Sequence, residues 1–272
     1  GVEAILRRVR DRAADAVDRR RSSDERHDPD DLPVPPDDTT PVRSRRSGYY
    51  ADIDWERVEA FSPDEPCRVW IVVAPGDFVA AGTPVAVVAG QVDDRIADEI
   101  ESWLHFDSER WIEADFSYGV RNLVDVALKA LSPGVNDPTT ATMAIERIGE
   151  TMAVAGRDHP ERSVRTEAGT EVVVAIREWD DTLWSAVRQV VEYGKRDVAV
   201  VTAILRMLAG LAWADGAIDR RPTIRRLAAE VRSWVAVDVT RVEWDERRIS
   251  AEFDLLDRAL DRQAVAHRWH PL

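Results

Sequence analysis

Apolar residues recur at intervals of three and four positions along most of the second half of the chain. The clearest run covers 120–131, where Val120, Leu123, Val124 and Ala127 share one helical face. Similar runs occupy 141–152, 183–191, 198–212, 224–235 and 249–260. We therefore expect five or six helices packed around one core.

A different pattern lies between residues 69 and 88, where Val69, Ile71 and Val73 alternate with other residues. The segments "APGD" and "AAGTP" supply turns between short apolar runs. Short strands joined by tight turns are typical of a small barrel or sandwich. The predicted fold class is thus α+β and mainly α, with a small barrel-sandwich-like module ahead of a helical domain.

The predicted domain organisation has five parts along the chain. A basic amphipathic helix is followed by an Asp-rich and Pro-rich linker that we expect to be flexible, then by the β module, by the helical domain and by a tail. The helical domain is interrupted by a short hairpin near 163–178. The boundaries of the five parts are 1–20, 21–46, 47–90, 91–262 and 263–272.

The N-terminal residues and the longest apolar stretch bear on membrane insertion. The chain starts with Gly1 in a basic segment rather than with methionine, so we expect it to be a fragment of a longer protein. Residues 69–90 are the best candidate for a span, but Pro75, Gly76 and Asp77 interrupt them well short of the 18 or so apolar residues required. The sequence therefore predicts no membrane helix within the chain.

Charge and cysteine usage narrow the function classes. The formal net charge is −14, with 37 Lys and Arg against 51 Asp and Glu, which disfavours a nucleic-acid partner. Lys129 and Lys195 are the only lysines, a bias that fits either a GC-rich genome or a halophile-like adaptation to a salty cytoplasm. With Cys67 as the single cysteine, a disulfide framework is excluded and a reducing compartment is the default.

The segment "SPGVNDPTT" joins the two most regular helical runs. Gly134 is expected to take the positive φ that ends the first helix, and Asp137 with Pro138 is a strong signal for the start of the next. Four other polar residues stand beside the free helix N–H groups: Ser132, Asn136, Thr139 and Thr140. The segment is either a structural corner or a binding site for a small polar or anionic ligand.

The helix before this corner carries two charged residues at i and i+4, Arg121 and Asp125, and Asp115 precedes its start. One interpretation makes Arg121 an anion clamp and either aspartate a general base. The other is a surface ion pair worth about 0.3 to 0.5 kcal/mol. His267 and His270 lack a third ligand, and nucleotide-binding, hydrolase and zinc-protease motifs are missing, so no metal or cofactor is expected.

Three blocks carry a family resemblance: "SGYYADIDWERV", "APGDFVAAGTPVAVV" and "DFSYGVRNLVDVALKALSPGVNDPTTA". In this order they resemble the predicted membrane proteins of domain of unknown function twenty-two fifty-four. The resemblance implies a soluble C-terminal portion of an integral protein of the cell membrane, with the helix at 1–20 following the last upstream span. Arg-rich flanks beside a span favour the cytoplasmic side.

The second block is also similar to biotinyl and lipoyl half-barrels. Those carriers need a lysine at a hairpin tip, and both lysines of this chain lie outside the block. A carrier function is therefore excluded, while the expectation of a barrel remains.

Two functions stay open. The first is a regulatory, assembly or ligand-sensing cytoplasmic domain of a membrane protein with a transport-type function, expected to be a homo-oligomer. The alternative is a hydrolase or transferase that acts on a polar or anionic membrane-derived substrate. The alternative requires five polar residues in one pocket: Asp115, Arg121, Asp125, Asn136 and Asp137.

Overall fold

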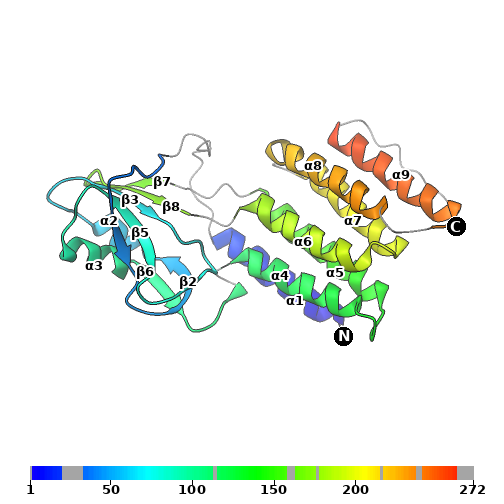
Figure 1. The fold of residues 1–272 in the computed structure, drawn as a ribbon, viewed down its shortest axis with the longest axis horizontal. Helices are drawn as coiled ribbons and strands as arrows, with labels where there is room; N and C mark the ends of the chain where they lie inside the picture. Colours follow the sequence, from blue (N-terminus) through cyan, green and yellow to red (C-terminus); the bar gives the residue numbers. More distant parts are fainter. Residues whose placement is uncertain are drawn as a thin grey trace. The chain divides into compact units, whose positions relative to one another are not determined.

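The computed structural model describes most of the chain (Figure 1). The described residues are 2–19, 33–112, 115–157, 163–175, 178–214, 217–236 and 241–261. They divide into two compact units, each described here by itself. The helical unit comprises Gly1–Val17, Gly119–Asp158 and Glu178–Leu272. The β unit comprises Asp18–Tyr118 and His159–Arg177.

The β unit contains two sheets. The first has five strands in the order β1 (Thr39–Arg43), β5 (Pro84–Ala89), β3 (Arg68–Ile71), β8 (Glu171–Val174) and β7 (Ser163–Arg165). The second has the order β4 (Phe78–Val79), β2 (Gly48–Ile53) and β6 (Leu104–Asp107). Every pairing is antiparallel except the one between β3 and β8. Both sheets are open in the described residues, so a mainly helical α+β fold is confirmed without a closed barrel.

One apolar core joins the two sheets to the helices α2 (Trp55–Ala60) and α3 (Asp94–Ser102). On β3 its members Val69 and Ile71 stand two positions apart, so both side chains lie on the core face of the strand. Within this core the ring of Phe61 meets Trp103 edge to face, with centroids 5.0 Å apart. This core fixes α2 and α3 against the strands.

The β unit extends beyond the predicted module at 47–90. Part of the predicted linker forms β1, whose Val42 is buried in the core. Pro41 is tolerated there because β1 is an edge strand, where a missing N–H costs little. Residues 21–32 of the predicted linker lie outside the described residues, as does the predicted tail at 263–272.

The hairpin predicted near 163–178 is a second correction to the domain boundaries. The sequence pattern places this hairpin in the helical domain, but β8 pairs in parallel with β3, in the register Arg68 to Glu171. The partners are 103 positions apart in the chain. Local periodicity shows that β8 is a strand and cannot show its distant partner. Helix α3 and strand β6 likewise belong to the β unit.

The helical unit is built around a central apolar helix, α7. Its elements are α1 (Val2–Arg19), most of α4 (Phe116–Ala130), α5 (Pro138–Ala155), α6 (Trp179–Gly194), α7 (Val198–Trp213), α8 (Ala217–Ala236) and α9 (Glu243–Leu260). Helix α7 packs against α5, α8 and α9 with Val201, Leu205 and Leu208 buried. Gly149 permits a close approach, since a Cβ there would lie 2.7 Å from Met207 Cγ.

Helix α1 packs on the helical unit through its apolar stripe. Leu6 and Ala13 are fully buried, while Arg10 Nε lies 3.0 Å from Glu150 Oε2 on α5. Arg147 on α5 makes a hydrogen bond to Glu150 that raises the pKa of its guanidinium. No helix in the described part of the chain combines the length and the apolar character needed to cross a bilayer.

Candidate functional site

The corner between α4 and α5 follows the predicted architecture with one change. Asn136, not Gly134, has the positive φ, at 48°, and its N–H donates to the Ser132 carbonyl oxygen at 2.9 Å. The prediction for Gly134 is therefore wrong. Asparagine adopts this left-handed conformation more readily than other side chains, so it closes the turn in place of glycine.

Asp137 is the N-cap of α5, as predicted. Its Oδ1 accepts from the Thr140 N–H at 3.0 Å, and its Oδ2 accepts from Thr140 Oγ1 at 2.6 Å. These hydrogen bonds lower the pKa of the Asp137 carboxyl, with the side-chain bond contributing most. Both carboxylate oxygens are thus used within the first turn of the helix, which begins with Pro138.

The remaining polar groups of the corner also serve local structure or face solvent. Ser132 Oγ donates to the Lys129 carbonyl oxygen at 2.7 Å, at the end of α4. Thr139 is exposed, and its carbonyl oxygen accepts from Thr142 Oγ1 at 2.8 Å. Asn136 is exposed as well. The corner is accounted for by helix termination and capping.

Arg121 and Asp125 form the predicted i, i+4 ion pair on α4. Arg121 Nη2 lies 2.8 Å from Asp125 Oδ1, and the two side chains are 48% and 53% exposed. Arg121 Nη1 also donates to Gln189 Oε1 on α6 at 2.8 Å. This geometry favours the surface ion pair over an anion clamp with a general base.

Asp115 is the most enclosed of the eight predicted residues, and it lies in the β unit whereas the other seven lie in the helical unit. Its carboxylate accepts from Arg110 Nε at 3.0 Å and from Ser117, at 2.9 Å from the N–H and 2.6 Å from Oγ. The Arg110 guanidinium lies 4.8 Å from the centre of the Tyr118 ring. We call these four residues the Asp115 cluster. It caps the start of α4.

The turn at Gly76 closes over the Asp115 cluster. Gly76 has φ 90°, and a Cβ there would lie 2.2 Å from Asp115 Oδ2. The cavity beside the cluster measures about 10 Å³, which is about the space of one water molecule. Asp115 therefore has a structural environment without room for a substrate.

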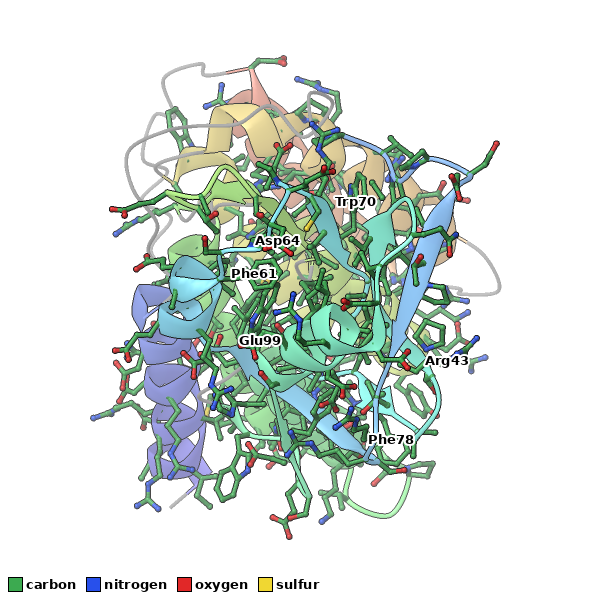
Figure 2. The ribbon with its side chains drawn as sticks, turned by 90° about the vertical axis from the view of Figure 1, so that its left-hand side faces the viewer. Arg43, Phe61, Asp64, Trp70, Phe78 and Glu99 are labelled. Atoms are coloured by element: carbon green, nitrogen blue, oxygen red, sulfur yellow. The ribbon has the colours of Figure 1, made fainter. Side chains whose placement is uncertain are left out.

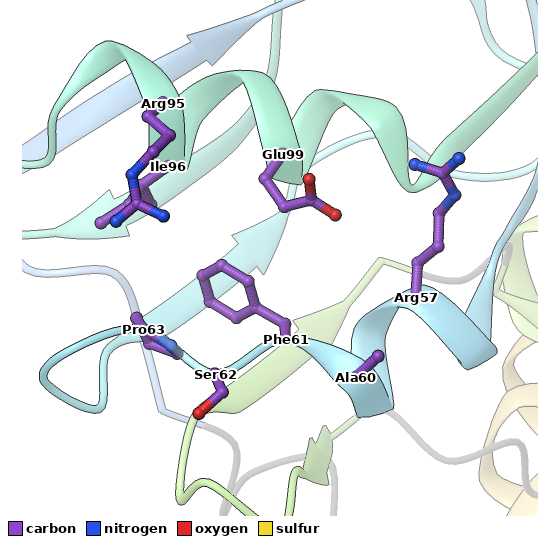
Figure 3. Close-up of a pocket in the computed structure, with 8 residues that line it drawn as sticks. All are labelled: Arg57, Ala60, Phe61, Ser62, Pro63, Arg95, Ile96 and Glu99. Atoms are coloured by element: carbon purple, nitrogen blue, oxygen red, sulfur yellow. The ribbon is translucent and has the colours of Figure 1, made fainter.

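A larger cavity lies elsewhere in the β unit, between α2 and α3, and we call it the α2–α3 groove. It measures about 510 Å³ and is open to solvent. Figure 2 looks onto the β unit and labels Phe61 and Glu99. The lining residues appear in Figure 3: Arg57, Ala60, Phe61, Ser62, Pro63, Arg95, Ile96 and Glu99. None of the eight predicted residues is among them.

The charges of the α2–α3 groove are arranged along its length. Figure 3 shows Arg95 and Arg57 toward opposite ends, with Glu99 between them and the Phe61 ring below. Arg57 is held in place, since its Nη1 donates to Ser102 Oγ at 2.9 Å and its Nε lies 3.4 Å from Asp54 Oδ2. Asp54 is itself the N-cap of α2.

Arg95 and Glu99 project from successive turns of α3 and are exposed. Neither side chain has a hydrogen-bond or ion-pair partner among the described residues. A signal for them exists in the sequence, because charged residues at i and i+4 share one helical face. That this face of α3 lies beside α2 depends on the tertiary fold. Local sequence patterns therefore did not predict the groove.

Metal binding receives no geometric support from the part of the chain that the structure describes. No group of three or more His, Cys, Asp and Glu side chains there is arranged to hold a metal ion. His267 and His270 lie outside the described residues.

Comparisons with known proteins identify a family and leave its chemistry open. A family model described as "Predicted membrane protein (DUF2254)" matches residues 1–210. The chain is 29% identical over 188 residues to an uncharacterized protein of Mycobacterium tuberculosis strain CDC 1551, and 28% identical over 188 residues to one of Mycobacterium bovis. Each alignment covers 66% of this chain and 36% of the relative, so the chain matches about a third of their length. No solved structure matches the chain.

Proposed function

Because the chain belongs to the predicted membrane protein family DUF2254, we propose that it is a regulatory, ligand-sensing part of a membrane protein. In this proposal it lies on the cytoplasmic side, follows upstream membrane spans and works within a homo-oligomer. The β unit senses the ligand, and the helical unit connects to the membrane portion, whose function is of the transport type. The two sheets of the β unit form a barrel-like arrangement in this proposal, which their shared core supports.

The attachment of α1 to α5 carries this proposal. The ion pair between Arg10 and Glu150 and the burial of Leu6 make α1 part of the helical unit. Arg147 Nη2 also lies 3.8 Å from Glu3 Oε1. A displacement of membrane spans preceding α1 would therefore move α5 as well, which is the coupling that a regulatory domain needs.

The local use of the polar residues weighs against the hydrolase or transferase alternative. A general base must reach the proton that it abstracts. Asp137 is bonded to Thr140 through both oxygens, and Asp125 is paired with Arg121 at the surface. We therefore favour the regulatory role.

The test uses the full-length protein in native membranes. We expect it to resist carbonate extraction, to be cleaved within this portion only in inside-out vesicles, and to form oligomers in native mass spectrometry. A protein that is extracted by carbonate would contradict the proposal. So would a strict monomer whose extramembrane portion binds neither ligand nor partner.

The coupling through α1 has its own test. Arg10→Glu breaks the ion pair with Glu150 and should speed hydrogen exchange in α5 of the full-length protein. Arg8→Glu is the matched control, because Arg8 is exposed and has no partner among the described residues. Equal exchange in the two variants would show that the attachment of α1 does not matter.

A further inference from the structure

We propose that the α2–α3 groove binds a zwitterion in which one ammonium group lies near two anionic groups, one a carboxylate and one a phosphate. The biological role of this binding rests on the ligand-sensing function proposed above. Binding itself can be measured on the 272-residue chain without the membrane portion.

The two arginines provide the anionic subsites. Arg95 is exposed and unpartnered among the described residues, so its full guanidinium is available to a ligand. Arg57 is positioned in advance by Asp54 and Ser102, which engage its Nε and Nη1. Its remaining N–H groups are free to donate, and a guanidinium suits the planar geometry of carboxylate and phosphate oxygens. Preorganisation of Arg57 reduces the entropy lost on binding.

Glu99 determines what lies between the subsites. Its carboxylate has no partner among the described residues, and Figure 3 places it between the two arginines. A ligand with only negative groups would bring charge of like sign beside Glu99, which disfavours binding. An ammonium group at the same place removes the repulsion and adds an attraction. The order of charges in the groove thus selects a zwitterion over a simple dianion.

The floor of the groove suits the carbon atoms of such a molecule. Ile96 and Pro63 add apolar surface beside the buried ring of Phe61, which is fixed by Trp103. A volume of about 510 Å³ is within the usual range for small-molecule sites. Because the groove is open, the same charges could come from a free phosphorylated amino acid or from an aminophospholipid head group.

The decisive comparison uses O-phospho-L-serine and 3-phosphooxypropionate, the same molecule without its ammonium group, in titration calorimetry. We expect the wild-type chain to prefer O-phospho-L-serine. Arg95→Gln should weaken its binding about tenfold or more, as expected for loss of a charged hydrogen-bond partner. Glu99→Gln should reverse the preference between the two probes. Both residues are exposed, so neither variant should unfold the chain.

Two control variants lie in the same unit but outside the groove. Arg45→Gln removes an exposed arginine that pairs with Asp98, and Glu59→Gln removes an exposed carboxylate of α2. Both should bind as the wild type does. Equal effects of the control and groove variants would overturn the site.

Vesicles distinguish the two sources of the ligand. If the source is a lipid, phosphatidylserine vesicles should bind the chain more tightly than phosphatidylglycerol vesicles of equal charge, and Glu99→Gln should abolish the difference. If the source is a free metabolite, only the soluble probe should bind. The proposal is overturned if neither O-phospho-L-serine nor phosphatidylserine vesicles bind the chain. It is also overturned if 3-phosphooxypropionate binds the wild type as tightly as O-phospho-L-serine does. Either failure would leave the membrane location proposed above untouched.

Discussion

Replacing Asp115 by asparagine should lower the stability of the chain much more than the same change at Asp125 in the surface ion pair of α4, because the Asp115 carboxylate is buried. The side chains of Asp115 and Arg110 are 1% and 25% exposed, against 53% and 48% for Asp125 and Arg121. Asp115→Asn retains one oxygen for the Ser117 N–H but can turn an amide NH₂ toward Arg110. Removing one partner of a buried pair costs about 3 to 5 kcal/mol, and the partial exposure of Arg110 places the expected loss near 2 to 4 kcal/mol.

The assay is urea denaturation followed by near-ultraviolet circular dichroism, with Asp125→Asn as the matched control. The control breaks an exposed pair and should cost at most about 0.5 kcal/mol. The two units can unfold separately, so the transition that reports on the β unit is the one to compare. Equal losses in the two variants would refute the assignment of Asp115 as a structural cap.

Three further predictions use the same denaturation assay. Gly76→Ala should destabilise the chain by about 2 kcal/mol or more because of its positive φ and the nearby carboxylate, whereas Gly134→Ala should be tolerated. Arg241→Met should cost about 2 kcal/mol, since Arg241 donates to a carbonyl oxygen at the end of α6 and to another at the end of α8; Arg241→Lys should not restore the loss. Because hydrogen bonds lower the folded-state pKa of Asp137, its contribution is present above the unfolded pKa of about 3.9 and is lost as pH falls through the folded value. Thr140→Val should therefore destabilise the chain near pH 7 and make progressively less difference below about pH 4, and a pH-independent difference would contradict the reasoning.

Local sequence patterns predicted the helical elements well because each pattern is fixed by its own neighbours. The apolar stripe beginning at Val120 gave α4, and the Asp137 and Pro138 pair gave the start of α5. Which residue has the positive φ, Asn136 or Gly134, is set by the number of residues in the turn that follows α4. Composition alone could not fix that number.

The candidate site was beyond sequence reasoning for a different reason. Arg57 and Glu99 come from separate helices that the shared core of the β unit brings to one groove. The same core contains Val172 of β8, more than a hundred positions after β3. Such long-range pairing leaves no trace in local periodicity. The polar motifs of the sequence instead indicate the corner, where capping accounts for the polar side chains.

The assignment of ligand binding to the α2–α3 groove, and not to the corner, is tested most directly by nuclear magnetic resonance. O-phospho-L-serine is titrated into the isotopically labelled 272-residue chain, and the shifted amides are mapped. We predict shifts concentrated at 57–63 and 95–99, with the amides of 132–140 unchanged. Shifts concentrated at 132–140, or no shifts at all, would contradict the assignment.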